Sequence, residues 1–73
     1  MKKEIATILR KEAIFEWKMY GVKNYVQVMF ESGYEIPNHI ISLICEKVDC
    51  CSNVSCVHSD VMNGYCLMVE FYR

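Results

Sequence analysis

Long hydrophobic runs are missing from this 73-residue sequence. No apolar stretch approaches the roughly 18 residues that a membrane-spanning helix needs. The N-terminal stretch MKKEIATILRKEAIF begins with basic residues, but Arg10, Lys11 and Glu12 interrupt its apolar residues well short of a signal-peptide core. We therefore expect a cytoplasmic protein that has no membrane partner.

An excess of either charge is also missing, because eight Lys and Arg residues oppose nine Asp and Glu residues. The only cluster of basic residues consists of Lys2, Lys3, Arg10 and Lys11. Nucleic-acid binding needs a broader basic surface, so we do not expect it. The sequence has no phosphate-binding loop, no dinucleotide-binding motif and no HExxH motif. We therefore expect a protein that is not an enzyme and that carries no cofactor.

Proline occurs once and glycine three times, so few positions force the chain to turn. In the first half, apolar residues spaced by three and four predict a helix, and the alternation in FEWKM then predicts a strand. The segment YVQVMFE is rich in β-branched and aromatic residues, as strands are. The predicted elements are a helix at residues 3–13, a strand at 15–19, a turn at 21–24 and a strand at 25–31.

The second half repeats this order of elements. Residues 32–37 form a predicted linker, and Pro37 suits the first turn of a second helix that ends near Cys50. The predicted elements that follow are a strand at residues 54–58, a turn at 60–64 that ends in Asn-Gly, and a strand at 65–72.

The two halves also resemble each other residue by residue. A shift of 41 positions places Val26, Val28 and Phe30 on apolar residues of the final strand. This similarity suggests an internal duplication of residues 1–36 and 37–73 within a single domain. We predict an α+β fold of the order α-β-β-α-β-β, with a four-stranded antiparallel sheet and both helices on one face.

A winged helix, with three helices and a β-hairpin, is the alternative fold. The apolar residues of segment 22–31 also fit a helical spacing, and periodicity alone does not separate the two patterns. On this alternative the protein would be a DNA-binding transcriptional regulator that reads DNA with residues 38–49. That helix offers Lys47 beside Glu46 and Asp49, which is a poor set for contacting phosphates.

Three of the five cysteines and one of the two histidines lie in the stretch VDCCSNVSCVH, residues 48–58. Their spacing lacks the paired CxxC or HxxxH units of structural zinc sites. We expect a junction between a helix end and a strand, with reduced thiols and no bound metal. A small zinc-stapled domain is the alternative, and its ligands would be Cys50, Cys51, Cys56 and His58.

Alternation along the strands divides their side chains between two faces. The predicted inward residues are Phe15, Trp17, Met19, Val26, Val28, Phe30, Leu67, Val69 and Phe71. The predicted outward residues are Glu16, Lys18, Tyr25, Gln27, Met29, Glu31, Cys66, Met68, Glu70 and Tyr72. Tyrosines and methionines ringed by charges resemble the apolar centre and polar rim of a protein interface.

These features lead to a prediction of function. We expect a non-enzymatic protein-interaction module that self-associates as a homodimer or docks on another protein. One class of such modules is the small inhibitor of a larger enzyme or nuclease, of the kind that phages encode, including anti-CRISPR-like proteins. The predicted partner-binding residues are Tyr25, Gln27, Met29, Glu31, Met68, Glu70 and Tyr72.

Overall fold

The computed structural model describes residues 1–31, 34–60, 62 and 64–73. Its elements are α1 (Lys2–Lys11), β1 (Trp17–Val22), β2 (Tyr25–Phe30), α2 (Asn38–Val48), β3 (Cys51–Ser59) and β4 (Gly64–Tyr72). The predicted α-β-β-α-β-β order is confirmed, and residues 25–30 form a strand. Parts of the predicted linker (residues 32 and 33) and of the predicted turn (residues 61 and 63) lie outside the described residues.

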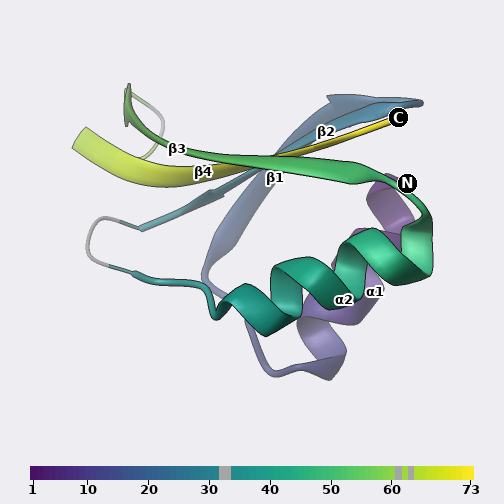
Figure 1. The fold of residues 1–73 in the computed structure, drawn as a ribbon. Helices are drawn as coiled ribbons and strands as arrows, with labels where there is room; N and C mark the ends of the chain where they lie inside the picture. The colour runs from purple at the N-terminus through teal and green to yellow at the C-terminus, as the bar shows by residue number, and fades with distance from the viewer. Residues whose placement is uncertain (32–33, 61, 63) are drawn as a thin grey trace.

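The four strands form one antiparallel sheet in the order β1-β2-β4-β3. Both helices lie on the same face of this sheet, as predicted (Figure 1). Helix α1 packs against β1 and helix α2 against β3, and the helices also contact each other. In the part of the chain that the structure describes, neither helix is long and apolar enough to cross a membrane.

The hydrophobic core lies between the helices and the inner face of the sheet. Its fully buried large side chains are Ile5, Leu9, Val26, Val28, Phe30, Ile44, Val48, Val69 and Phe71. Burial of each such side chain contributes about 1.5–3 kcal/mol to folding. The inward prediction is wrong for Phe15, which is 65% exposed. It precedes β1, and so the alternation of that strand does not direct its side chain.

Strand β1 is longer than predicted and continues through Gly21 to Val22. Gly21 has φ of 157°, and a Cβ atom there would lie 2.3 Å from the Tyr25 carbonyl oxygen. Only glycine fits this close approach between β1 and β2, so Gly21 extends the strand where a turn was predicted. Strand β3 likewise begins three residues earlier than predicted, at Cys51.

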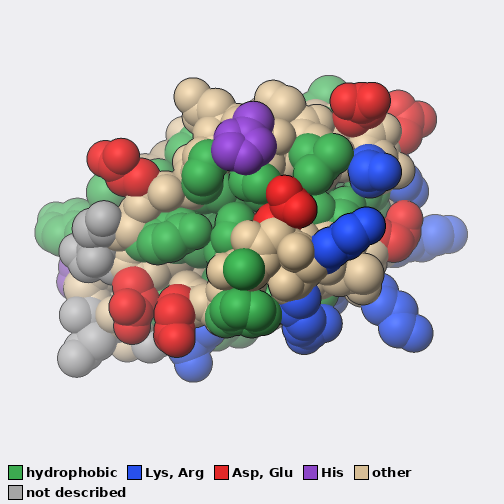
Figure 2. Space-filling model, turned by 90° about the horizontal axis from the view of Figure 1, so that it is seen from below, with side chains coloured by type: hydrophobic (Ala, Val, Ile, Leu, Met, Phe, Trp, Pro, Cys, Tyr) green, Lys and Arg blue, Asp and Glu red, His purple; other side chains and the backbone are tan. Residues whose placement is uncertain are grey.

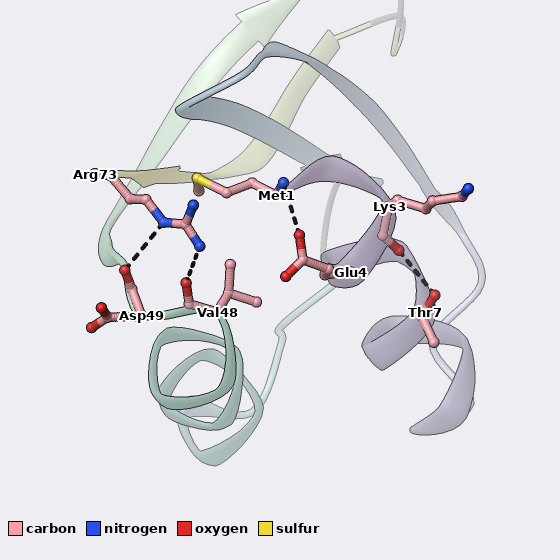
Figure 3. A network of polar contacts seen from close by, with 7 residues as sticks. All are labelled: Met1, Lys3, Glu4, Thr7, Val48, Asp49 and Arg73. Carbon is pink, nitrogen blue, oxygen red and sulfur yellow. Dashed lines mark hydrogen bonds and ion pairs between the residues drawn. The ribbon is translucent and has the colours of Figure 1, made fainter.

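Helix α1 is held at both ends by local contacts. The Met1 ammonium pairs with the Glu4 carboxylate over 3.0 Å (Figure 3). At the other end, Ala13 adopts φ of 61°, and the Ile14 N–H donates a hydrogen bond to the Leu9 carbonyl over 2.9 Å. This left-handed residue followed by a bond back to the last turn is a Schellman cap.

Helix α2 ends in the same way. Asp49 has φ of 56°, and the Cys50 N–H donates to the Cys45 carbonyl over 3.1 Å. The Arg73 guanidinium adds hydrogen bonds to the carbonyls of Val48 and, over 3.3 Å, of Asp49 (Figure 3). A cation is favourable at this negative end of a helix dipole, so Arg73 ties the end of α2 to the end of β4.

The centre of the sheet relates the two halves of the chain. In the pairing of β2 with β4, Val28 lies directly opposite Val69. The flanking pairs are Val26 with Phe71 and Phe30 with Leu67. A two-fold rotation about the Val28–Val69 pair would carry Val26 onto Leu67 and Phe30 onto Phe71. Each of these residues is moved to the position 41 residues further along the chain. This arrangement agrees with the residue similarity found at a shift of 41.

Candidate functional site

The outer face of the sheet, which carries neither helix, is the candidate site (Figure 1). The strand register arranges its side chains in rows that run across the sheet. The first row contains Val22, Tyr25, Tyr72 and Cys51. The second contains Tyr20, Gln27, Glu70 and Asn53, and the third contains Lys18, Met29, Met68 and Ser55.

Polar side chains of the second row form a network centred on Glu70. One carboxylate oxygen of Glu70 accepts a hydrogen bond from the Tyr25 hydroxyl, and the other accepts from the Asn53 amide over 3.3 Å. The Gln27 amide donates to the Tyr25 hydroxyl over 3.1 Å. The network spans β2, β4 and β3, and it fixes the orientation of Tyr25.

The Glu70 carboxylate also changes the acidity of Tyr25. Its hydrogen bond with the phenol raises the pKa of Tyr25 above the ordinary value of 10.0. The cause is that loss of the phenol proton would break the bond and place a phenolate beside a carboxylate. Tyr25 therefore remains a neutral donor over the physiological pH range.

Exposed aromatic and apolar side chains gather at one end of the outer face. This end consists of the first row together with Tyr20 of the second row. Tyr20 and Tyr72 are each 40% exposed, and Val22 is 73% exposed. Tyr25 is half-buried between them, directly opposite both Val22 and Tyr72. We call Tyr20, Val22, Tyr25 and Tyr72 the tyrosine end of the outer face.

The third row is more enclosed than the sequence predicted. Met29 lies directly opposite Met68 and is only 9% exposed. Cys66, predicted to face outward, is also on the outer face but is 1% exposed. The end of β3 bends toward this side of the sheet, away from the helices (Figure 1). Burial raises the pKa of the Cys66 thiol, which fits an apolar packing role.

The predicted partner-binding residues thus separate into groups. Tyr25, Gln27, Glu70 and Tyr72 lie together in the first two rows. Met29 and Met68 lie in the third row, and Glu31 follows the end of β2. Sequence reasoning missed Tyr20 and Val22 because it placed a turn at Gly21. The signal that could have found them is the alternation KMYGV, which continues to Val22 if glycine is allowed inside the strand.

The cysteines and His58 do not converge. Cys51 lies on the outer face, whereas Cys56 and His58 share the inner side of β3. Cys56 follows Cys50 by six positions, which corresponds to about 20 Å of extended chain. The structure therefore does not bring together the four residues that would be the ligands of the zinc alternative. In residues 1–31, 34–60, 62 and 64–73, no group of three or more His, Cys, Asp or Glu side chains is placed to hold a metal ion.

Cys50 is not a poised thiolate either. Burial, followed by the neighbouring Cys45 thiol, raises the pKa of Cys50 to about 11. A nucleophilic or metal-binding cysteine needs its thiolate form at neutral pH. Cys45 and Cys50 are the residues joined by the backbone bond at the end of α2, a position where apolar contact is usual.

Basic side chains gather on the helix side of the molecule, toward the lower right of Figure 2. Lys2, Lys3 and Arg10 line a pocket of about 400 Å³ together with Trp17 and Met19. The Arg10 guanidinium lies 5.5 Å from the centre of the Trp17 ring. A guanidinium at this distance makes a cation–π contact with the ring, so Arg10 has a structural partner within the fold. The two lysines are exposed at the start of α1.

The tyrosine end is thus the surface that combines exposed rings, hydrogen-bonding hydroxyls and a fixed central residue. Aromatic rings with polar tips bury large areas while keeping a hydrogen-bond partner, which suits binding to another protein. No family model, curated protein or solved structure matches this chain.

Proposed function

We propose that this protein is a non-enzymatic protein-interaction module that binds another protein through the tyrosine end of its outer face. One observation carries the proposal: Tyr20, Val22 and Tyr72 are exposed around the half-buried Tyr25, and together they form one cluster from three neighbouring strands on a face free of helices. Tyrosine is among the residues that contribute most to binding at protein interfaces.

The polar network beneath the cluster supports this function. Ordering a mobile side chain on binding costs about 0.5–1.5 kcal/mol. Tyr25 is already oriented by Glu70 and Gln27 in the free protein, so much of that cost is met on folding. Tyr20 and Tyr72 flank this fixed residue and supply the additional area that a partner would cover.

We place this function in the cytoplasm, where the five free cysteines would stay reduced. The class of partner that we favour is a larger enzyme or nuclease that the protein inhibits, as anti-CRISPR-like proteins do. The net charge of −1, which gives no reason to expect a polyanion partner, is compatible with an inhibitor that acts by covering a protein surface.

The test compares two tyrosine substitutions. In the double variant Tyr20→Ser and Tyr72→Ser, the tyrosine end loses two exposed rings that are not in the core. The control is Tyr65→Ser, which removes an exposed tyrosine from the opposite face. Affinity capture from an extract of the source organism, followed by quantitative mass spectrometry, should find a protein that the control retains and the double variant loses at least tenfold. Equal capture by both variants would refute the proposal.

The DNA-binding alternative requires a different outcome. A transcriptional regulator should form a complex with duplex DNA that survives physiological salt and weakens when Lys2, Lys3 and Arg10 are replaced. We expect only weak binding that salt abolishes, because α2 presents Lys47 beside Glu46. A gel-shift titration at two salt concentrations separates the alternatives.

A further inference from the structure

Strand β3 is a long edge strand without the usual protection. It is last in the order β1-β2-β4-β3, and in the described part of the chain no strand pairs with its other side. Its nine residues, CSNVSCVHS, include no Lys, Arg, Asp, Glu, Pro or Gly. Natural edge strands are commonly protected by charge, proline or short length. The opposite edge follows that rule, since β1 has six residues and carries Lys18.

The backbone of β3 presents hydrogen-bonding groups to the open edge. The Arg73 N–H donates to the Asn24 carbonyl over 3.1 Å, which continues the β2–β4 pairing and fixes its alternation. In an antiparallel ladder, successive residues direct their N–H and C=O groups to opposite sides. The odd-numbered residues of β4 therefore bond to β2, and its even-numbered residues bond to β3. The even-numbered residues of β4 lie opposite odd-numbered residues of β3, so the odd-numbered residues of β3 are the ones that bond to β4. The residues whose groups point to the open edge are Ser52, Val54, Cys56 and His58.

We propose that β3 pairs antiparallel with β3 of a second copy, so that two four-stranded sheets become one continuous sheet. Full overlap of the nine residues places Ser55 opposite Ser55 of the second copy, on the two-fold axis. Val54 then lies opposite Cys56 of the second copy, and Ser52 opposite His58. In this register every open N–H and C=O of β3 meets a complementary group, because the paired residues are all even-numbered.

A second copy suits this edge because the strand is complementary to itself. In this register Ser55 alone faces its own copy, and every other residue of β3 faces a different residue of the second copy. Because β3 has no Asp, Glu, Lys or Arg, none of these pairs brings like charges together. Val54 is 47% exposed and borders a groove of about 510 Å³ with Ile41 and Leu67. Pairing would bring Cys56 of the second copy beside Val54 and cover part of this apolar surface.

The dimer does not use the tyrosine end, so it is independent of the proposed function. A two-fold axis perpendicular to the sheet keeps both outer faces on the same side of the dimer. The two tyrosine ends would then face the same direction and be available to one partner assembly.

The test introduces a charge at Ser55, which lies on the two-fold axis. Ser55→Lys should place two ammonium groups opposite each other and weaken the dimer about tenfold or more. Ser55→Glu should do the same with two carboxylates, whereas an equal mixture of both variants should dimerise again. Ser42→Lys, on the exposed side of α2, is the matched control and should dimerise like the unmodified protein. Sedimentation velocity over a range of concentrations, with reductant present, measures each case.

Amide hydrogen exchange by NMR provides a second measurement that does not depend on variants. The odd-numbered amides of β3 should be protected at all concentrations, and those of Val54, Cys56 and His58 only where the dimer forms. Three outcomes would overturn the proposal: a monomer at every concentration, a dimer with these amides unprotected, or Ser55→Lys dimerising unchanged. Association lost in the Tyr20→Ser and Tyr72→Ser variant but kept in Ser55→Lys would instead assign self-association to the tyrosine end.

Discussion

Tyr25 and Glu70 are diagonal neighbours on adjacent strands, and the phenol of one donates a hydrogen bond to the carboxylate of the other. The bond joins the exposed first row of the outer face to the polar second row. Together with the bond from the Gln27 amide, it sets the orientation of Tyr25 within the tyrosine end. Several measurable properties depend on this contact and on the backbone around it.

Replacement of Glu70 by Gln should lower the pKa of Tyr25 toward its ordinary value of 10.0, because the charged acceptor is lost. A group whose pKa is raised by folding stabilises the protein below its unfolded pKa, and that contribution is lost as pH rises through the folded value. Unfolding free energy should thus fall less steeply above pH about 10 in the variant. Ultraviolet titration of phenolate and urea unfolding at several pH values test this, with Glu31→Gln as the control. An unchanged titration curve would contradict the assigned role of Glu70.

The replacement Gly21→Ala should destabilise the protein by roughly 2 kcal/mol or more. The added Cβ would lie 2.3 Å from the Tyr25 carbonyl oxygen and 2.8 Å from the Val26 Cα atom. Gly64→Ala is the matched control, because Gly64 has φ of 143° but a Cβ atom added there would meet no described atom within 4 Å apart from those of its chain neighbours. The control should lose only the conformational cost, about 1 kcal/mol. Urea unfolding monitored by circular dichroism gives both values, and equal losses would refute the steric explanation.

The opposite substitution should stabilise the end of α1. Ala13 has φ of 61°, a conformation that costs a non-glycine residue about 1–2 kcal/mol. Ala13→Gly removes that cost and should raise the free energy of unfolding by about 0.5–1 kcal/mol, after the greater flexibility of glycine in the unfolded chain is included. Thr7→Gly, inside the same helix, should instead lower it by about 0.3 kcal/mol, the difference in helix propensity between Thr and Gly. Thermal unfolding of both variants distinguishes a cap effect from a general effect of glycine.

Protein purified without chelator should contain no stoichiometric zinc, and added zinc should leave its melting temperature unchanged. Cys51 and Cys56 lie on opposite faces of β3, and the pKa of Cys50 is raised to about 11, which opposes the thiolate that zinc requires. Elemental analysis and thermal unfolding with and without zinc provide the measurement. Near-equimolar zinc together with unfolding by a chelator would show that the cysteines rearrange around a metal.

The order of elements and the faces of the central strands could be predicted from the sequence because they follow local periodicity. Val26, Val28 and Phe30 alternate with residues of the outer face, and the structure buries all three. The end of β1 could not be placed, since the role of Gly21 depends on how closely β2 approaches it. Periodicity in the sequence describes a single strand, whereas the distance between β1 and β2 depends on how the two strands pair.

The same limit applies to the candidate site. Alternation correctly assigned Met29 and Cys66 to the outer face, but it predicted exposure, and both are buried. Exposure depends on neighbouring strands and on the path of the chain around them, which side-chain periodicity does not contain. The prediction missed Tyr20 and Val22 because it ended the first strand at residue 19, whereas β1 continues to Val22.

The Val28–Val69 pair has a consequence for the speed of folding. The pairs β1–β2 and β3–β4 are joined by short connections, so each hairpin closes a small loop at little entropic cost. The pairing of β2 with β4 instead joins residues that are far apart in the chain, such as Val28 and Val69, which are 41 positions apart. Non-local pairing of this kind slows folding, and so the two hairpins should form early and their docking along Val28 and Val69 should limit the rate.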